Sequence, residues 1–213
     1  SRSIINPFLK SQALTDAALS TRDRERTRNL LQEAWKAAES IPLSYSQSKA
    51  FIQISAAAAR IYPQEKKAWA ERTFAQIQNL KNSQLQAFAI QEMVFHWAPL
   101  DVEQAERIVI GISPLFPEVR AYSFIYLSRN TGIRKVKAVF FLRNALAEIS
   151  KVNDPFEAQK IKSLIAKSWV RLELGEALRI LPQIEDPFYR SEILRTTISL
   201  PVPLSPATTT VLS

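Results

Sequence analysis

A short apolar pattern recurs five times along this chain, and it restricts the possible folds more than any other feature. Each copy ends in an isoleucine and includes the residues three, four and seven positions before it, which on a helix form a stripe along one face. The first residue of the stripe is alanine in four copies and leucine in one. The closing isoleucines lie 36, 35, 37 and 35 residues apart, at Ile41, Ile77, Ile112, Ile149 and Ile184. A nearly constant spacing in this range predicts a repeated helical unit.

The last copy gives the clearest view of the unit. Its stripe predicts a helix that ends near Ile184, and the following Asp186-Pro187 supplies a capping oxygen and a first-turn proline for a second helix. A turn-prone or polar piece and then a second apolar stretch follow each of the other four isoleucines as well. The sequence therefore predicts about five helix-turn-helix repeats with a period of about 36 residues. An irregular helical bundle with helices of similar length is the alternative.

The period and the helix-turn-helix unit resemble the tetratricopeptide-like and HEAT-like α-solenoids over about residues 22–200. The tetratricopeptide Trp/Leu-Gly/Tyr pattern is not met, because the three glycines, Gly111, Gly132 and Gly175, lie outside any such pattern. The resemblance implies an all-α, right-handed α-solenoid. It carries the architecture only, and no binding residue is transferred from either family.

Composition supports an all-α fold. The 46% hydrophobic content excludes wholesale disorder, and the three glycines with few valine-rich alternating runs argue against a sheet. We expect a lead-in and capping helix over 1–21, the repeats over 22–200 and a flexible Pro/Ser/Thr-rich tail over 201–213. The tail is either an inert terminus or a ligand for a proline-reading partner.

Local signals place some helix boundaries. Ser20, with Asp23 three residues later, is expected to start a helix over 22–40, and Asp101 is expected to cap a helix that runs to Ile112. Asn130-Thr131-Gly132 is expected to form a turn in which Gly132 takes a positive φ.

Charge and targeting signals leave the compartment undecided. The net charge of +8 is spread along the chain without a basic tail, and cysteine is absent, which excludes disulfides. No apolar run approaches the roughly 18 residues of a membrane span. The chain begins at Ser1 without a visible signal peptide. A cytoplasmic protein and an exported mature chain both remain open.

Catalytic and metal-binding patterns are absent from the sequence. His96 is the sole histidine, and Glu92 lies one helical turn before it. These two residues would supply two metal ligands, whereas a site needs at least three. No phosphate-binding glycine loop and no nucleophile turn is present. The sequence therefore predicts neither an enzyme nor a cofactor, and a helical enzyme module that acts on a polymer through groove carboxylates is the third function considered.

One region combines positive charge with aromatic residues. The stretch 119–147 contains six Lys and Arg residues and no acid, with five Phe and Tyr residues between them. Arg134, Lys137 and Phe141 are expected on a helical face different from that of the stripe, where they would hold an anion. The alternative is that the aromatics belong to the core. The candidate binding residues are Arg120, Arg129, Arg134, Lys137, Phe141 and Arg143.

These observations favour a non-enzymatic adaptor or scaffold that binds a protein or peptide partner in an extended groove. The alternative function is binding of nucleic acid or another polyanion through the region 120–143, which predicts an affinity that falls steeply with salt. The sequence leaves the oligomeric state and the identity of the partner open.

Overall fold

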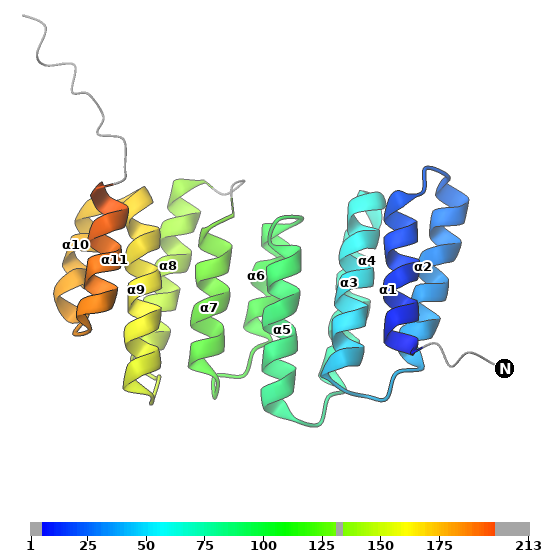
Figure 1. Ribbon diagram of the computed structural model, residues 1–213, viewed down its shortest axis with the longest axis horizontal. Coiled ribbons are helices and arrows are strands. Elements are labelled where there is room, and N and C mark those ends of the chain that lie inside the picture. Colours follow the sequence, from blue (N-terminus) through cyan, green and yellow to red (C-terminus); the bar gives the residue numbers. More distant parts are fainter. Residues whose placement is uncertain (1–5, 131–133, 199–213) are drawn as a thin grey trace, which may run out of the picture.

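The computed structural model describes residues 6–130 and 134–198, and the regular structure in them is entirely helical, as the sequence predicted. Eleven α-helices and two short 3-10 helices occur in these ranges (Figure 1). The turn expected around Gly132 falls partly outside the described residues, as the lead-in does, and the tail over 201–213 falls wholly outside them. The helices are α1 (Pro7–Ser20), α2 (Arg24–Glu39), α3 (Tyr45–Ile61), α4 (Lys66–Gln78), α5 (Ser83–Trp97), α6 (Val102–Ile110), α7 (Pro117–Ser128), α8 (Lys135–Ile149), α9 (Pro155–Leu172), α10 (Leu174–Ile180) and α11 (Pro187–Ile198), with 3-10 turns at Pro63–Glu65 and Leu181–Gln183.

Polar caps set several helix starts. The Asp101 carboxylate accepts a hydrogen bond from the Gln104 N–H at 2.9 Å and begins α6, as predicted. The expected start at Ser20 is wrong, because Ser20 is the last residue of α1 and donates its hydroxyl to the Asp16 carbonyl. Asp23 caps α2 instead, since its carboxylate accepts from the N–H groups of the next turn. A carboxylate there also complements the positive end of the helix dipole.

The helices pack mainly against near neighbours in the chain and form two rows. Each odd-numbered helix from α1 to α11 contacts the next odd-numbered helix, and these six helices face the viewer in Figure 1. The even-numbered helices lie behind them and contact one another far less, with α4 and α6 the closest such pair. We call these sets the odd row and the even row.

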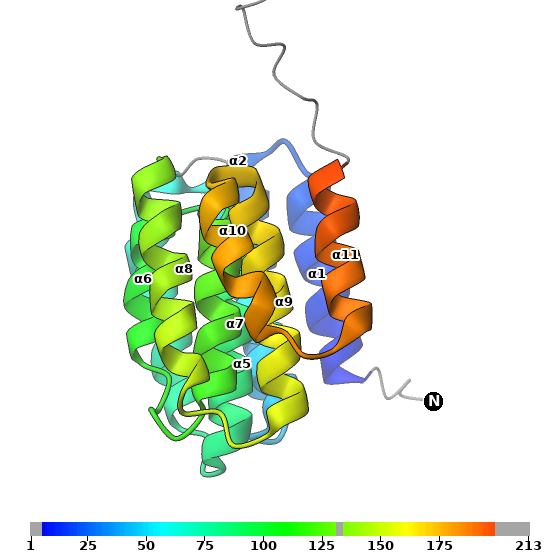
Figure 2. The same ribbon diagram turned by 90° about the vertical axis from the view of Figure 1, so that its left-hand side faces the viewer.

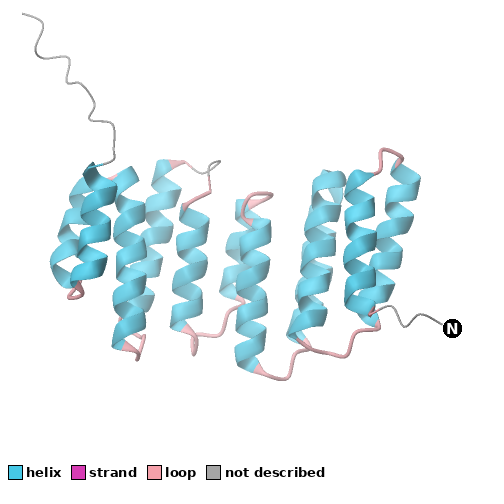
Figure 3. Ribbon diagram, in the orientation of Figure 1, coloured by secondary structure: helices cyan, strands magenta, loops and turns pink. Residues whose placement is uncertain are grey.

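The odd row is curved. In the view along the molecule, α1 and α11 lie farther to the right than α5 and α7, on the side that the odd row occupies (Figure 2). The exposed side of the odd row is therefore concave. Loops join the helices alternately at the two ends of the rows and leave the middle of the concave side to helical residues (Figure 3).

The five apolar stripes lie in or directly after the even-numbered helices α2 to α10 and face the core. Every stripe residue is buried except Phe74, Leu146 and Leu181, which are partly buried. The first stripe lies in a buried cluster around α2 and α3, and the other four lie in a second cluster, against which these three residues pack. For the last stripe the sequence predicted one continuous helix that ends near Ile184, and this prediction is wrong. α10 ends at Ile180 and a 3-10 turn follows, because Pro182 has no N–H to continue the α-helical ladder.

One close approach in the even row depends on a glycine. Gly111 ends α6, and a Cβ at that position would lie 2.4 Å from the Phe74 ring of α4. The missing side chain therefore lets the partly buried Phe74 pack where α4 and α6 come together.

Candidate functional site

Three pockets follow one another along the odd row. The first lies between α1, α3 and α5 and includes Asp16, Arg60 and His96. The second lies between α3, α5 and α7, and the third between α7, α9 and α11, with Ala138 of α8 at its base. We call them the polar, aromatic and basic pockets. Together they make the concave side the candidate binding surface.

The aromatic pocket has a volume of about 510 Å³. Leu85, Phe88, Glu92 and Phe95 recur at i, i+3, i+7 and i+10 on α5, so they form a stripe on the helix face that points away from the core. Phe95 meets Tyr126 of α7 edge to face, with ring centroids 4.5 Å apart. Leu85, Phe88, Phe95 and Tyr126 are all exposed.

A carboxylate lies beside these aromatic rings. Tyr45 of α3 donates its hydroxyl to Glu92 Oε2 at 2.5 Å, and Lys49 Nζ lies 3.7 Å from Glu92 Oε1. Burial and the bond to Glu92 raise the pKa of Tyr45 well above its ordinary value. Tyr45 therefore remains a protonated donor at physiological pH. The pocket combines an apolar surface with a carboxylate that is held by Tyr45 and paired with Lys49.

The basic pocket is similar in size, about 530 Å³, and opposite in charge. Arg129 at the end of α7 faces Lys167 and Arg171 of α9, and Ser168 and Thr196 add hydroxyl groups. No acid lines it, although Glu192 of α11 forms an ion pair with Lys167. The lining charge of +3 is thus reduced by one and remains positive.

Arg129 is held in place within this pocket. Its Nε donates to Ser168 Oγ at 3.0 Å and its Nη2 donates to the Leu164 carbonyl at 3.3 Å. Burial lowers the pKa of Arg129 from its ordinary value, and the positive charge of Arg171 lowers it further. Like charges held together without an acid between them favour a bound anion.

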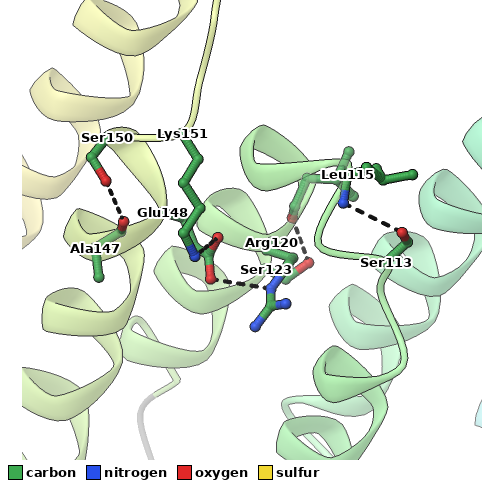
Figure 4. Close-up of polar contacts among 9 residues, drawn as sticks. Ser113, Leu115, Arg120, Ser123, Ala147, Glu148, Ser150 and Lys151 are labelled. Atoms are coloured by element: carbon green, nitrogen blue, oxygen red, sulfur yellow. Dashed lines mark hydrogen bonds and ion pairs between the residues drawn. The ribbon is translucent and has the colours of Figure 1, made fainter.

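Two of the other four predicted basic residues, Arg120 and Lys137, are neutralised by acids from outside the acid-free stretch. Arg120 Nε of α7 lies 3.2 Å from Glu148 Oε1 of α8, and Lys151 Nζ lies 3.1 Å from the other oxygen of the same carboxylate (Figure 4). Lys137 pairs with Glu106 of α6 at 3.0 Å. The local charge of +6 in the sequence therefore does not become a continuous basic surface.

The remaining predicted residues do not form one face. The expected surface position of Phe141 is wrong, because its ring is 0% exposed and lies in the core with Leu142 and Ala145. Arg134 and Arg143 are exposed on the even row, where neither has an acidic partner among the described residues, and Arg129 lies on the odd row. Of the six candidates, Arg129 is the one that lines a pocket on the odd row.

Sequence reasoning missed Lys167 and Arg171. The signal was present in α9, where Leu164, Lys167, Ser168 and Arg171 follow the i, i+3, i+4, i+7 spacing of a single face. Which other helix that face meets depends on packing rather than on local spacing. The basic pocket therefore could not be predicted from the sequence alone.

Within the described ranges, no group of three or more His, Asp and Glu side chains could hold a metal ion. None of the described helices combines the length and apolarity required to cross a bilayer. Comparison with known proteins found no matching protein-family model and no matching curated protein.

Proposed function

We propose that the protein is a right-handed α-solenoid of five helical hairpins, preceded by the capping helix α1, and that it acts as a non-enzymatic adaptor. In this proposal the concave side of the odd row binds an extended segment of a protein or peptide partner. The contacts of α2 with α3, α4 with α5, α6 with α7 and α8 with α9 support four of these hairpins, whereas α11 packs against α9.

The aromatic pocket is the observation that carries the binding proposal. Leu85, Phe88 and Phe95 expose apolar surface side by side on one helix, and Tyr126 extends that surface onto α7. Large apolar residues grouped in a concavity are typical of protein-binding hot spots, which use aromatic anchors. The Glu92 side chain, held by the Tyr45 hydroxyl, adds a fixed acceptor that would orient a peptide N–H or a basic side chain.

Polyanion binding is the second candidate, and the basic pocket favours it. Arg129, Lys167 and Arg171 present positive charge on the same concave side. The ion pairs of Arg120 and Lys137 weigh against a continuous nucleic-acid path over 120–143. An oligonucleotide titration at low and high salt separates the two candidates, because binding to phosphates falls steeply with salt.

Selection of random displayed peptides on the immobilised full chain tests the main proposal. Selected peptides should carry an apolar anchor residue and lose at least about tenfold in affinity with Phe95→Ser, the loss expected of a central aromatic contact. Phe140→Ser on the even row is the matched control, since Phe140 is 51% exposed and Phe95 is 45% exposed. Selected peptides that bind both variants equally would refute binding in the aromatic pocket.

A further inference from the structure

We propose that the bound segment is an acidic peptide, with carboxylates in the basic pocket and a neighbouring apolar side chain in the aromatic pocket. This inference rests on the proposed function and specifies its ligand. Neither pocket alone identifies the ligand. Their opposite chemistry and their adjacency at the C-terminal end of α7 do so together.

Charge is the first argument. Arg129 and Arg171 line the basic pocket without an acidic partner among the lining residues, whereas Glu192 neutralises Lys167. A guanidinium presents a planar fork of N–H donors that matches a carboxylate. Two such groups close together suit an incoming residue, or a pair of residues, with negative charge.

Preorganisation is the second argument. The bonds from Arg129 to Ser168 and to the Leu164 carbonyl use part of its donor fork and fix the guanidinium plane. The remaining N–H groups are available to a ligand without the entropy cost of ordering a long side chain. A fixed cation in a pocket binds an anion better than a mobile surface lysine does.

Adjacency is the third argument. Tyr126 lines the aromatic pocket and belongs to α7, and Arg129 lines the basic pocket and is the C-cap residue of α7. Residues three apart on a helix have Cβ atoms about 5–6 Å apart. An extended peptide advances about 3.3 Å per residue, so its apolar and acidic residues should lie one to three positions apart.

Glu92 distinguishes a peptide from a nucleic acid. A phosphate chain that passed from the basic pocket into the aromatic pocket would bring negative charge towards the Glu92 carboxylate, which accepts a hydrogen bond from Tyr45 and forms an ion pair with Lys49 at 3.7 Å. A peptide with its acids confined to one end avoids this repulsion. The two-pocket surface therefore favours a peptide whose acidic and apolar parts are separate.

Two synthetic peptides with a fluorescent label test the inference by anisotropy with the full chain. One has a tryptophan, a glycine and then three glutamates, and the other has glutamines in place of the glutamates. We expect the glutamate peptide to bind at least about tenfold more tightly at low salt, and this preference to shrink as salt rises. The same affinity for both peptides would overturn the acidic-ligand inference.

The variant Arg129→Gln/Arg171→Gln should abolish the preference for glutamate, and Arg143→Gln should retain it. Arg143 is the matched control because it is an exposed arginine on the even row. Arg171→Gln alone, at an exposed position outside the Ser168 bond, gives a second test if the double variant does not fold. A preference that survives both variants would overturn the assignment to the basic pocket.

Different outcomes of these experiments would reject the proposed function and the acidic-ligand inference. Equal binding of both peptides that still depends on Phe95 would support the groove and reject the acidic ligand. Absence of binding by both peptides, together with no effect of Phe95→Ser on selected peptides, would reject both. Displacement of the glutamate peptide by oligothymidylate at equal charge concentration would reject the peptide in favour of a polyanion.

Discussion

The two rows of helices differ in what holds successive members together. In the odd row each helix packs directly against the next, whereas the even-numbered helices are held mainly by the odd-numbered helices beside them. Small side chains do not account for this difference, since fully buried alanines occur in both rows. They include Ala89 and Ala121 in the odd row and Ala70 and Ala105 in the even row.

The odd row is therefore the tightly packed side of the molecule, and the helices of the even row are spread farther apart. Close approach in the odd row shortens that side and makes it concave, and the pockets form on it. The even row exposes apolar residues such as Ile110 and Val136 without a comparable pocket between its helices among those described above. Exposed apolar side chains therefore line pockets on the odd row, whereas on the even row they lie outside any such pocket.

The largest expected effect comes from breaking the apolar contact between the rows. Ile149→Asp would place an unpaired carboxylate in the buried stripe of α8, at a cost of at least about 4 kcal/mol. This is a large part of a typical stability of about 5–15 kcal/mol. We expect loss of the cooperative thermal transition by circular dichroism. Phe140→Asp, on the exposed side of the same helix, should remain folded, and a folded Ile149→Asp would contradict the assigned role of the stripe.

A smaller effect is expected from the polar connection between the rows. Arg120 of α7 is 21% exposed at its side chain and Glu148 of α8 is 7% exposed, so Arg120→Met leaves a nearly buried carboxylate with Lys151 alone. We expect a loss of about 2 kcal/mol in urea unfolding, and recovery of most of it in Arg120→Met/Glu148→Met.

Lys137→Met is the control for this cycle. Its pair with Glu106 is more exposed, so the loss should stay below about 1 kcal/mol. Equal losses for Arg120→Met and Lys137→Met would show that burial of the Arg120 pair does not matter.

The smallest effect is the dependence of stability on pH that comes from His96, in the pocket between α1, α3 and α5. Burial lowers the pKa of His96 from its ordinary value of about 6.5, and the charges of Arg60 and Lys49 lower it further while Glu92 raises it. The unfolded chain therefore binds a proton at a higher pH than the folded chain does. Stability should be complete above about pH 6.5 and should fall as the pH drops below that value towards the folded pKa.

Thermal melting at about pH 7.5 and about pH 5.5 measures this dependence, with an expected fall of less than about 3 °C due to His96. His96→Gln should remove that part of the slope, because glutamine does not titrate. The same slope in the wild type and in His96→Gln would assign the dependence to other groups.

The features that sequence predicted best are those set by neighbouring residues. Asp186-Pro187 predicted the start of α11, and the Asp186 carboxylate accepts from the Phe188 N–H at 2.8 Å. The stripes predicted the buried face of each even-numbered helix, because a helix with one apolar side must bury that side. The predicted helix start at Ser20 was wrong because Ser20 and Asp23 are both possible caps, and α1 continues through Ser20.

The features that sequence could not predict depend on which helices meet. Arg129 and Arg171 are far apart in the chain and meet because α7 packs against α9. The acids that neutralise Arg120 and Lys137 likewise come from other elements. Phe141 was misplaced because α8 contacts both α7 and α9, so its apolar surface is wider than one stripe.

The stepwise contacts of the odd row also have a mechanical consequence. When each helix touches mainly its nearest neighbours, a small rotation at one step is not opposed by distant parts of the chain, and such rotations add along the row. Bending of such a row would be opposed mainly by local contacts. A peptide bound in both pockets would span the steps from α5 to α9 and would oppose bending there, so binding of the peptide and bending of the row would be coupled.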